Sequence, residues 1–224
     1  MRKPLTDEEI EAFRERLVRV AEKLFAAHGV DGVTMRQIAK ALGYSQTAAY
    51  RYFADKDEIL AAVRAAALRR FCSRLETALK PGRDARENAK AVGRAYLQFA
   101  LDDPDSYRLI FGSKAPERDI PEYSRTVHRF NSSMTDYVRD LVNQGYLKGD
   151  PVELGRAFWV AAHGIVMMHL SGFLNSVRAR DELHKMVMQL IYRGARIEVE
   201  PNSGGKRASR ASKTVVRTTA RTRS

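Results

Sequence analysis

Cysteine is almost absent from this sequence, since Cys72 is the only one among 224 residues. A single thiol forms no intrachain disulfide, and it excludes zinc and iron–sulfur sites that need several cysteines. Long hydrophobic runs are missing too, because no segment reaches the roughly 18 apolar residues of a membrane span. The acidic segment 6–11 is unlike the start of a signal peptide. We therefore expect a soluble protein of the reducing cytoplasm.

Catalytic signatures are also missing. The sequence contains no Gly-x-Gly-x-x-Gly, His-Glu-x-x-His or Gly-x-Ser-x-Gly motif, and no complete phosphate loop surrounds Lys206. His163 and His169 are six residues apart and would lie on different faces of a helix, which argues against a metal pair. We predict that the protein is not an enzyme and uses no cofactor or metal.

The alternating pattern of β-strands is absent as well. Apolar residues instead recur at helical spacing, so we predict an all-α fold. Capping boxes at Thr6, Thr34 and Asp55 mark the starts of helices. Four helices should fill residues 6–80, and further helices are expected near residues 84–101, 103–111, 121–146, 150–175 and 180–197.

Positive charge exceeds negative charge, with 39 Lys and Arg against 27 Asp and Glu. Residues 201–224 carry seven of these bases and no acid, in a low-complexity tail that we expect to be disordered. Residues 1–60 hold ten bases and ten acids, whereas residues 34–56 hold four bases and one acid. The positive charge of the N-terminal region is thus concentrated in residues 34–56.

That basic segment has the pattern of a helix-turn-helix. Two short helices are expected at residues 34–42 and 45–53 with Gly43 between them, and the second has the size that fits the DNA major groove. Its exposed positions include Gln46, Thr47 and Arg51, residue types that contact base edges or phosphates. A simple helical hairpin without a DNA role has the same spacing, so spacing alone leaves both readings open.

The same residues resemble a known family signature. The motif is Thr34-x-Arg36-x-Ile38-Ala39-x-x-Leu42-Gly43-Tyr44-Ser45, followed by Tyr50-x-Tyr52-Phe53-x-x-Lys56-x-x-Ile59-Leu60. It resembles the amino-terminal signature of TetR-like (tetracycline-repressor-like) transcriptional regulators. The resemblance implies an N-terminal three-helix DNA-binding module with a helix-turn-helix. A long helix would join that module to a C-terminal helical domain for ligand binding and dimerisation.

The resemblance also implies roles for single residues. Phosphate contacts would fall to Thr34, Tyr50 and Lys56. Contacts to bases or flanking backbone would fall to Arg36, Tyr44, Gln46, Thr47 and Arg51, with Ser45 beside them at the start of the second helix. Other readings remain open, because Thr34 caps a helix in any case and Tyr50 also suits a half-buried packing position. Tyr52, Ala48 and Ala49 depart from the common His, Thr and Leu, so the operator sequence is not implied.

A second resemblance lies in Trp159-x-x-x-His163-Gly164, which is similar to the WHG-type C-terminal domain of one TetR-like branch. It implies a small-molecule effector pocket within residues 84–170. Candidate lining residues, chosen by residue type, are Phe99, Tyr107, Phe111, Phe130, Met134, Tyr137, Trp159, His163 and Met167. The alternative is that these side chains form an ordinary core and that His163 is a hydrogen-bonded core histidine.

Small residues near the C-terminus indicate a contact between helices. Ala157, Ala161 and Gly164 form a stripe that lets two helices approach closely. In the family that the sequence resembles, the last two long helices pair with those of a second subunit. The residues of the last helix that would join this homodimer interface are Leu183, Val187, Leu190 and Ile191.

These observations predict three regions: a helix-turn-helix DNA-binding domain at 1–60, a helical regulatory and dimerisation domain at 61–200, and a basic tail at 201–224. The predicted function is that of a homodimeric transcriptional regulator, a repressor released from a palindromic double-stranded DNA operator by a small-molecule effector. The alternative from another class is an architectural or scaffolding protein whose basic tail coats nucleic acid without sequence choice. The effector, the operator and the target genes are not predicted.

Overall fold

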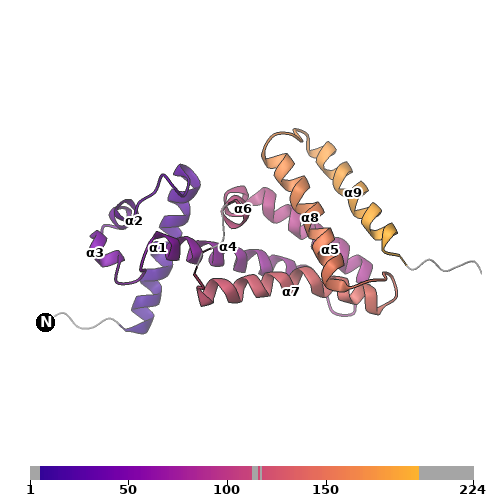
Figure 1. The fold of residues 1–224 in the computed structure, drawn as a ribbon, viewed down its shortest axis with the longest axis horizontal. Coiled ribbons are helices and arrows are strands. Elements are labelled where there is room, and N and C mark those ends of the chain that lie inside the picture. The colour runs from indigo at the N-terminus through magenta and orange to yellow at the C-terminus, as the bar shows by residue number, and fades with distance from the viewer. Residues whose placement is uncertain (1–5, 113–115, 117, 197–224) are drawn as a thin grey trace, which may run out of the picture.

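The computed structural model describes residues 6–112, 116 and 118–196, so the predicted basic tail lies outside the described residues. Regular structure in these ranges is entirely helical, as predicted (Figure 1). None of the helices described there is long and apolar enough to cross a membrane. The helices are α1 (Asp7–His28), α2 (Met35–Ala41), α3 (Gln46–Ala49), α4 (Lys56–Ala78), α5 (Ala85–Asp102), α6 (Pro104–Phe111), α7 (Pro121–Asn143), α8 (Pro151–Leu170) and α9 (Val177–Gly194).

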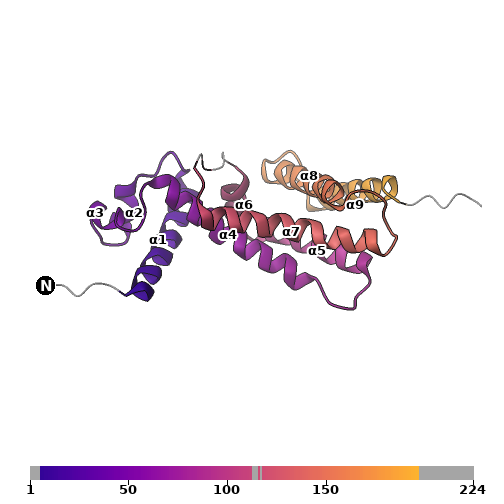
Figure 2. The same cartoon turned by 60° about the horizontal axis from the view of Figure 1, so that its bottom comes forward.

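The helices form an elongated molecule whose N-terminal end consists of α1, α2 and α3 (Figures 1 and 2). Helix α4 leads away from this end and packs along α7 and α5. Helices α8 and α9 pair with each other on the outside of the C-terminal half. Helix α4 therefore connects the two parts, as the sequence predicts.

The predicted caps start the helices where expected. The Thr6 and Thr34 side chains each accept the amide three residues later, and Glu9 and Gln37 return the contact, so both capping boxes are complete. Asp55 caps α4 by accepting the Glu58 amide at 2.8 Å. The Glu58 carboxylate instead accepts the amide of Ala54, so the predicted third box is only half formed.

Several helix boundaries differ from the prediction, among them the end of α7 at residue 143 rather than 146 and the end of α9 at residue 194 rather than 197. Helix α3 ends at Ala49 rather than at Phe53, because residues 50–52 form a turn in which the amides of Arg51 and Tyr52 donate to carbonyls three residues back. Helix α8 stops at Leu170, just before Gly172 adopts a φ of +84° that other residues rarely reach. Helix α9 begins at Val177, because the Ser176 side chain accepts the Ala179 amide.

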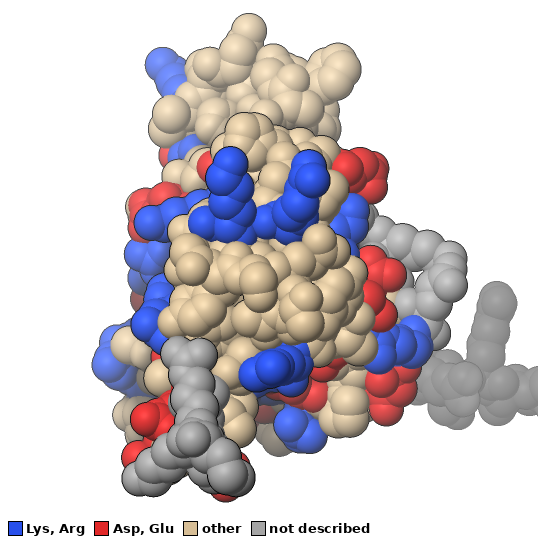
Figure 3. Space-filling model, turned by 90° about the vertical axis from the view of Figure 1, so that its left-hand side faces the viewer, with Lys and Arg blue, Asp and Glu red and all other residues tan. Residues whose placement is uncertain are grey.

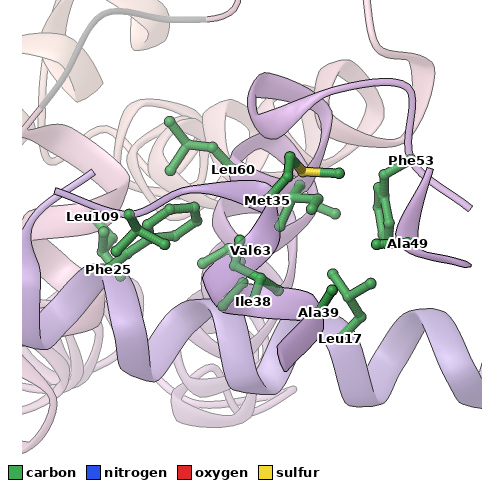
Figure 4. Packing of buried hydrophobic residues seen from close by; sticks show 14 of the residues in the cluster. Leu17, Phe25, Met35, Ile38, Ala39, Ala49, Phe53, Leu60, Val63 and Leu109 are labelled. Atoms are coloured by element: carbon green, nitrogen blue, oxygen red, sulfur yellow. The ribbon is translucent and has the colours of Figure 1, made fainter. Parts of the chain in front are cut away.

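Three hydrophobic clusters lie along the molecule, and helix α6 contributes to the first two. The first core joins α1–α4, and Leu109 of α6 is buried in it beside Phe25 (Figure 4). The second core joins α4–α8 and includes Tyr107 and Ile110 of the same helix. A helix of eight residues thus fixes the N-terminal end against the C-terminal half.

Candidate functional site

The N-terminal end of the molecule presents most of the residues that we predicted to contact DNA. Tyr44 and Tyr50 keep 46% and 48% of their surface exposed, which is unusual for large aromatic side chains. Lys56 is half-buried. The other six, all exposed, are Thr34, Arg36, Ser45, Gln46, Thr47 and Arg51.

Contacts from α1 hold the turn and α3 in place. The Phe13 ring packs against Tyr44 and Tyr52, with centroid distances of 4.9 and 4.2 Å. The Arg14 guanidinium lies 4.1 Å from the centre of the Phe53 ring and donates to the Tyr52 carbonyl. The sequence analysis did not single out Phe13 or Arg14, because they lie at least 30 positions before their partners.

Two of the predicted DNA contacts already serve as helix caps. The Thr34 hydroxyl lies 2.8 Å from Gln37 Oε1, to which it donates, and it accepts the Gln37 amide. The Ser45 hydroxyl accepts the Ala48 amide at 3.3 Å. To donate to a phosphate, the Thr34 hydroxyl would have to break its hydrogen bond to Gln37 Oε1 and form one to a phosphate oxygen instead.

The start of α4 carries a charged cluster. Lys56 Nζ donates to the carbonyl of Val30 at 3.1 Å, so a phosphate would share or replace this contact. Arg118, which lies before α7, donates to both Asp55 oxygens at 3.1 Å and lies 3.6 Å from the Glu58 carboxylate. Sequence reasoning missed Arg118, because it lies 63 residues beyond Asp55 in an irregular segment.

The electrostatics of this end suit a negatively charged partner. Lys and Arg side chains project from a surface that is otherwise largely uncharged, and the Asp and Glu side chains lie mainly toward its edges (Figure 3). The sequence places Arg36, Lys40, Arg51 and Lys56 in this region against Asp55. Arg118 pairs with that one acid, which leaves the bases of residues 34–56 uncompensated within the segment.

The nine residues predicted to line an effector pocket come together in the second core. Eight of them belong to its hydrophobic cluster. His163 completes the group through ring contacts with Tyr107, Phe111 and Trp159 at centroid distances of 5.7, 5.0 and 6.2 Å. Four helices, α5 to α8, supply these side chains. The structure therefore gathers the predicted set into one cluster where these four helices meet.

Polar groups run through this aromatic cluster. The Tyr96 hydroxyl lies 2.7 Å from the Tyr107 hydroxyl, which lies 2.7 Å from His163 Nδ1. Burial raises the pKa of both tyrosines and lowers the pKa of His163. Trp159 Nε1 is buried and forms no hydrogen bond with the described residues. The expected core histidine is thus hydrogen-bonded, through a tyrosine that the sequence analysis assigned only to the pocket.

Two clefts of about 690 Å³ each lie elsewhere. Both border α1 and α4, and none of the nine candidate effector residues lines either of them. In the described part of the chain, no three His, Cys, Asp or Glu side chains gather as metal ligands would. The His169 ring points to the Leu174 carbonyl at 2.7 Å, away from the contacts of His163.

The α8–α9 pair exposes an apolar surface. A side-chain carbon built on Gly164 would meet no described atom within 4 Å. Val160 and Met168, one turn on either side of Gly164, are 64% and 43% exposed, and Leu190 of α9 is 61% exposed. Of the other predicted interface residues, Ala157 is exposed, and those that are half-buried are Ala161, Leu183, Val187 and Ile191.

Comparison with known sequences matches both parts of the chain. The family model described as "Bacterial regulatory proteins, tetR family" matches residues 17–63, and "Tetracyclin repressor-like, C-terminal domain" matches residues 89–191. The HTH-type transcriptional activator FasR of Mycolicibacterium smegmatis is 28% identical over 175 residues, which cover 75% of each protein. An HTH-type transcriptional regulator of Mycobacterium tuberculosis is 29% identical over 120 residues, covering 51% of this chain and 48% of the relative.

Solved structures share the arrangement of the helices. A protein of unknown function from Rhodococcus sp. RHA1 has a TM-score of 0.70 at 24% identity, covering 82% of this chain and 95% of that chain. The fatty acid degradation regulator FadR from Bacillus halodurans has a TM-score of 0.66 at 16% identity, covering 85% and 97%. At these identities the likeness concerns the fold, a helix-turn-helix module followed by a helical C-terminal domain.

Proposed function

Because this chain belongs to the TetR family of bacterial transcriptional regulators, we propose that it binds a palindromic operator as a homodimer and leaves it when a small-molecule effector binds. The family is one of DNA-binding regulators, not enzymes. The observation that carries the proposal is the N-terminal end, where polar and basic side chains are exposed over a buried aromatic support. Side chains so held have the fixed geometry that base reading needs.

The proposed dimer interface is the apolar surface of α8 and α9. Large apolar side chains exposed together favour association with a partner. Gly164 lies on this surface with open space around it, which permits a second helix to come close. A two-fold dimer would present two helix-turn-helix modules to two half-sites about one helical turn apart or slightly more.

The proposed effector response works through α6. Tyr107 of this helix lies in the effector cluster, while Leu109 lies in the core of the DNA-binding module. Buried Arg64 of α4 donates to the Leu109 carbonyl at 2.8 Å, and Ser106 donates to Glu22 of α1 at 2.9 Å. A ligand that moves α6 would therefore move both α1 and α4. Release follows only if the ligand binds the DNA-incompetent arrangement better.

The proposed direction of regulation is repression by promoter blocking. The relative FasR is named a transcriptional activator, so the direction of regulation needs its own test. The position of the operator relative to the promoter separates the two cases. Binding over the promoter supports repression, and binding upstream with increased transcription contradicts it.

Selection of bound sites from random DNA duplexes tests the proposal. We expect the wild type to recover an inverted repeat. Gln46→Ala should relax preference at one base pair and cost ~1–3 kcal/mol at the best site. Tyr50→Phe and Lys56→Ala should weaken all sites similarly, because phosphate contacts carry no sequence information.

A matched control is Gln98→Ala, which removes an exposed glutamine from α5, a helix outside the helix-turn-helix. It should leave the selected sequence unchanged. An unchanged preference in Gln46→Ala would refute base reading by this residue, and the absence of any enriched repeat would refute the operator proposal.

A further inference from the structure

The polar groups of the effector cluster contain more donor hydrogens than their own contacts use. Tyr96, Tyr107 and neutral His163 together carry three acidic hydrogens, and two hydrogen bonds join them. Whichever way the hydroxyls rotate and whichever tautomer His163 adopts, one hydrogen remains. The remaining hydrogen is on His163 Nε2 if Tyr96 donates to Tyr107 and Tyr107 donates to His163. It is on Tyr96 if His163 donates to Tyr107 and Tyr107 donates to Tyr96, and it is on Tyr107 if that hydroxyl accepts from both neighbours.

Trp159 Nε1 adds a second spare donor. It is buried, and among the described residues it has no hydrogen-bond partner. The Trp159 indole faces the Tyr96 phenol, whose pKa is raised by burial and lowered by the polar groups of Tyr107 and Trp159, but the indole N–H does not reach the geometry of a hydrogen bond there. A buried N–H group without an acceptor is costly, and it marks a place where an acceptor atom would be stabilised.

In the tautomer that leaves the spare hydrogen on His163 Nε2, the rings that carry the two spare donors are neighbours in an apolar surrounding. Trp159 and His163 are one turn apart on α8, with ring centroids separated by 6.2 Å. Phe111 lies 6.0 Å from the Trp159 ring and 5.0 Å from the His163 ring, and Phe130 lies 5.7 Å from Trp159. A molecule with an apolar body and a small acceptor group matches this combination.

Among the described residues, no Lys or Arg side chain lies over a ring of this cluster. Burial lowers the pKa of His163, which keeps its ring uncharged at neutral pH. Of the described cationic side chains, the buried ones are Arg64 and Arg180. Arg64 donates to the Leu109 carbonyl and Arg180 to the Asp181 carboxylate, both outside this group of rings. A carboxylate placed here would lose its hydration without gaining a counter-charge.

We infer that the site around Trp159 and His163 binds a neutral, largely apolar molecule with a carbonyl-type acceptor and discriminates against carboxylates of the same shape. This inference deepens the proposed function, on which it rests, by stating the chemical class of the effector. Trp159 donates to the acceptor, and the aromatic rings enclose the apolar body.

The fluorescence of Trp159 tests the inference directly, because it is the only tryptophan in the chain. The probes are three molecules of similar shape: cyclohexyl methyl ketone, cyclohexanecarboxylate and ethylcyclohexane. At pH 7.5 the ketone should change the emission saturably. We expect an apparent dissociation constant at least about tenfold lower for the ketone than for the carboxylate, and lower than for the hydrocarbon, which lacks an acceptor.

A pair of variants identifies the donor. Trp159→Phe keeps an aromatic ring but removes the N–H group, so in calorimetric titration the advantage of the ketone over ethylcyclohexane should shrink. Tyr146→Phe is the matched control, since its hydroxyl donates to Asp84 in a separate cluster. It should bind all three probes as the wild type does.

Several results would overturn the inference. These are tighter binding of the carboxylate, equal binding of ketone and hydrocarbon, or no saturable signal from any probe up to its solubility limit. Failure of the proposed function looks different. A ketone that binds as stated but leaves DNA affinity unaltered would contradict effector release while leaving the chemistry of the site in place.

Discussion

His163 combines a half-buried position with a hydrogen bond to Tyr107, and this gives it a measurable effect on stability. Burial lowers its pKa below the ordinary value of 6.5. As the pH falls through 6.5, the unfolded chain takes up a proton that the folded protein resists. The folded state is therefore fully favoured above this pH and loses stability below it. His184 contributes in the same direction, because burial also lowers its pKa.

We predict that the free energy of unfolding decreases as the pH is lowered from about 7.5 to about 5.5, and that His163→Gln reduces this decrease. Urea titrations at several pH values would measure it. His184→Gln should remove the part of this pH dependence that comes from His184. The free energy of unfolding of the double variant should therefore change least with pH. A His163→Gln profile as steep as that of the wild type would contradict the assignment.

Residues near each other in sequence were the easier ones to predict. Thr6 and Thr34 form their capping boxes with partners only three positions away. Contacts between distant residues were not predictable, because the sequence around an arginine such as Arg14 or Arg118 does not indicate which remote residue it contacts. The spare N–H group of Trp159 also required coordinates, since it depends on how four helices meet.

Among the helices, α3 shows why the boundaries were harder to predict than the helices themselves. Residues 45–53 have helical spacing, yet the helix ends after Ala49. After Ala49 the amides of Arg51 and Tyr52 donate to carbonyls only three residues back, so the backbone winds more tightly than an α-helix, while Ala49 and Phe53 stay on one buried face and Tyr50 stays exposed. This tightening keeps the apolar spacing of the segment, so sequence periodicity does not register it.

Helix α8 carries a prediction about dimerisation. Gly164→Leu should weaken the homodimer by ~1–3 kcal/mol or more, because the larger side chain holds the paired helices apart. The isolated subunit has open space at this position, so its fold should tolerate the change. Sedimentation equilibrium over a concentration series would measure both wild type and variant.

Gly155→Ala on the same helix is the matched control. Its new carbon would lie 2.9 Å from the Met134 carbonyl oxygen inside the subunit, so it should lower thermal stability rather than dimer affinity. A wild type that sediments as a monomer at micromolar concentration would remove the basis of the dimer proposal.

At the scale of the whole molecule, the basic tail gives a prediction that rests on sequence alone. Its seven positive charges would steepen the salt dependence of DNA binding by at most ~6 units per subunit, at about 0.9 per phosphate contact. Deleting residues 201–224 should lower specific and non-specific affinity by similar factors. Binding to operator and scrambled duplexes between about 50 and 200 mM salt would measure this. Equal slopes with and without the tail would show that it has no role in binding.

The burial of Leu109 in the core of α1–α4 limits how this protein can be recombined with its relatives. In a chimera that joins the first 60 residues of this protein to the regulatory domain of a relative, the relative's own residue would replace Leu109 beside Phe25. The DNA-binding module therefore depends on α6 for a complete hydrophobic core and is not an independently exchangeable unit. Chimeras that take the helix-turn-helix and the segment corresponding to α6 from the same parent should fold and show that parent's operator specificity. Chimeras that take the two segments from different parents should fold poorly.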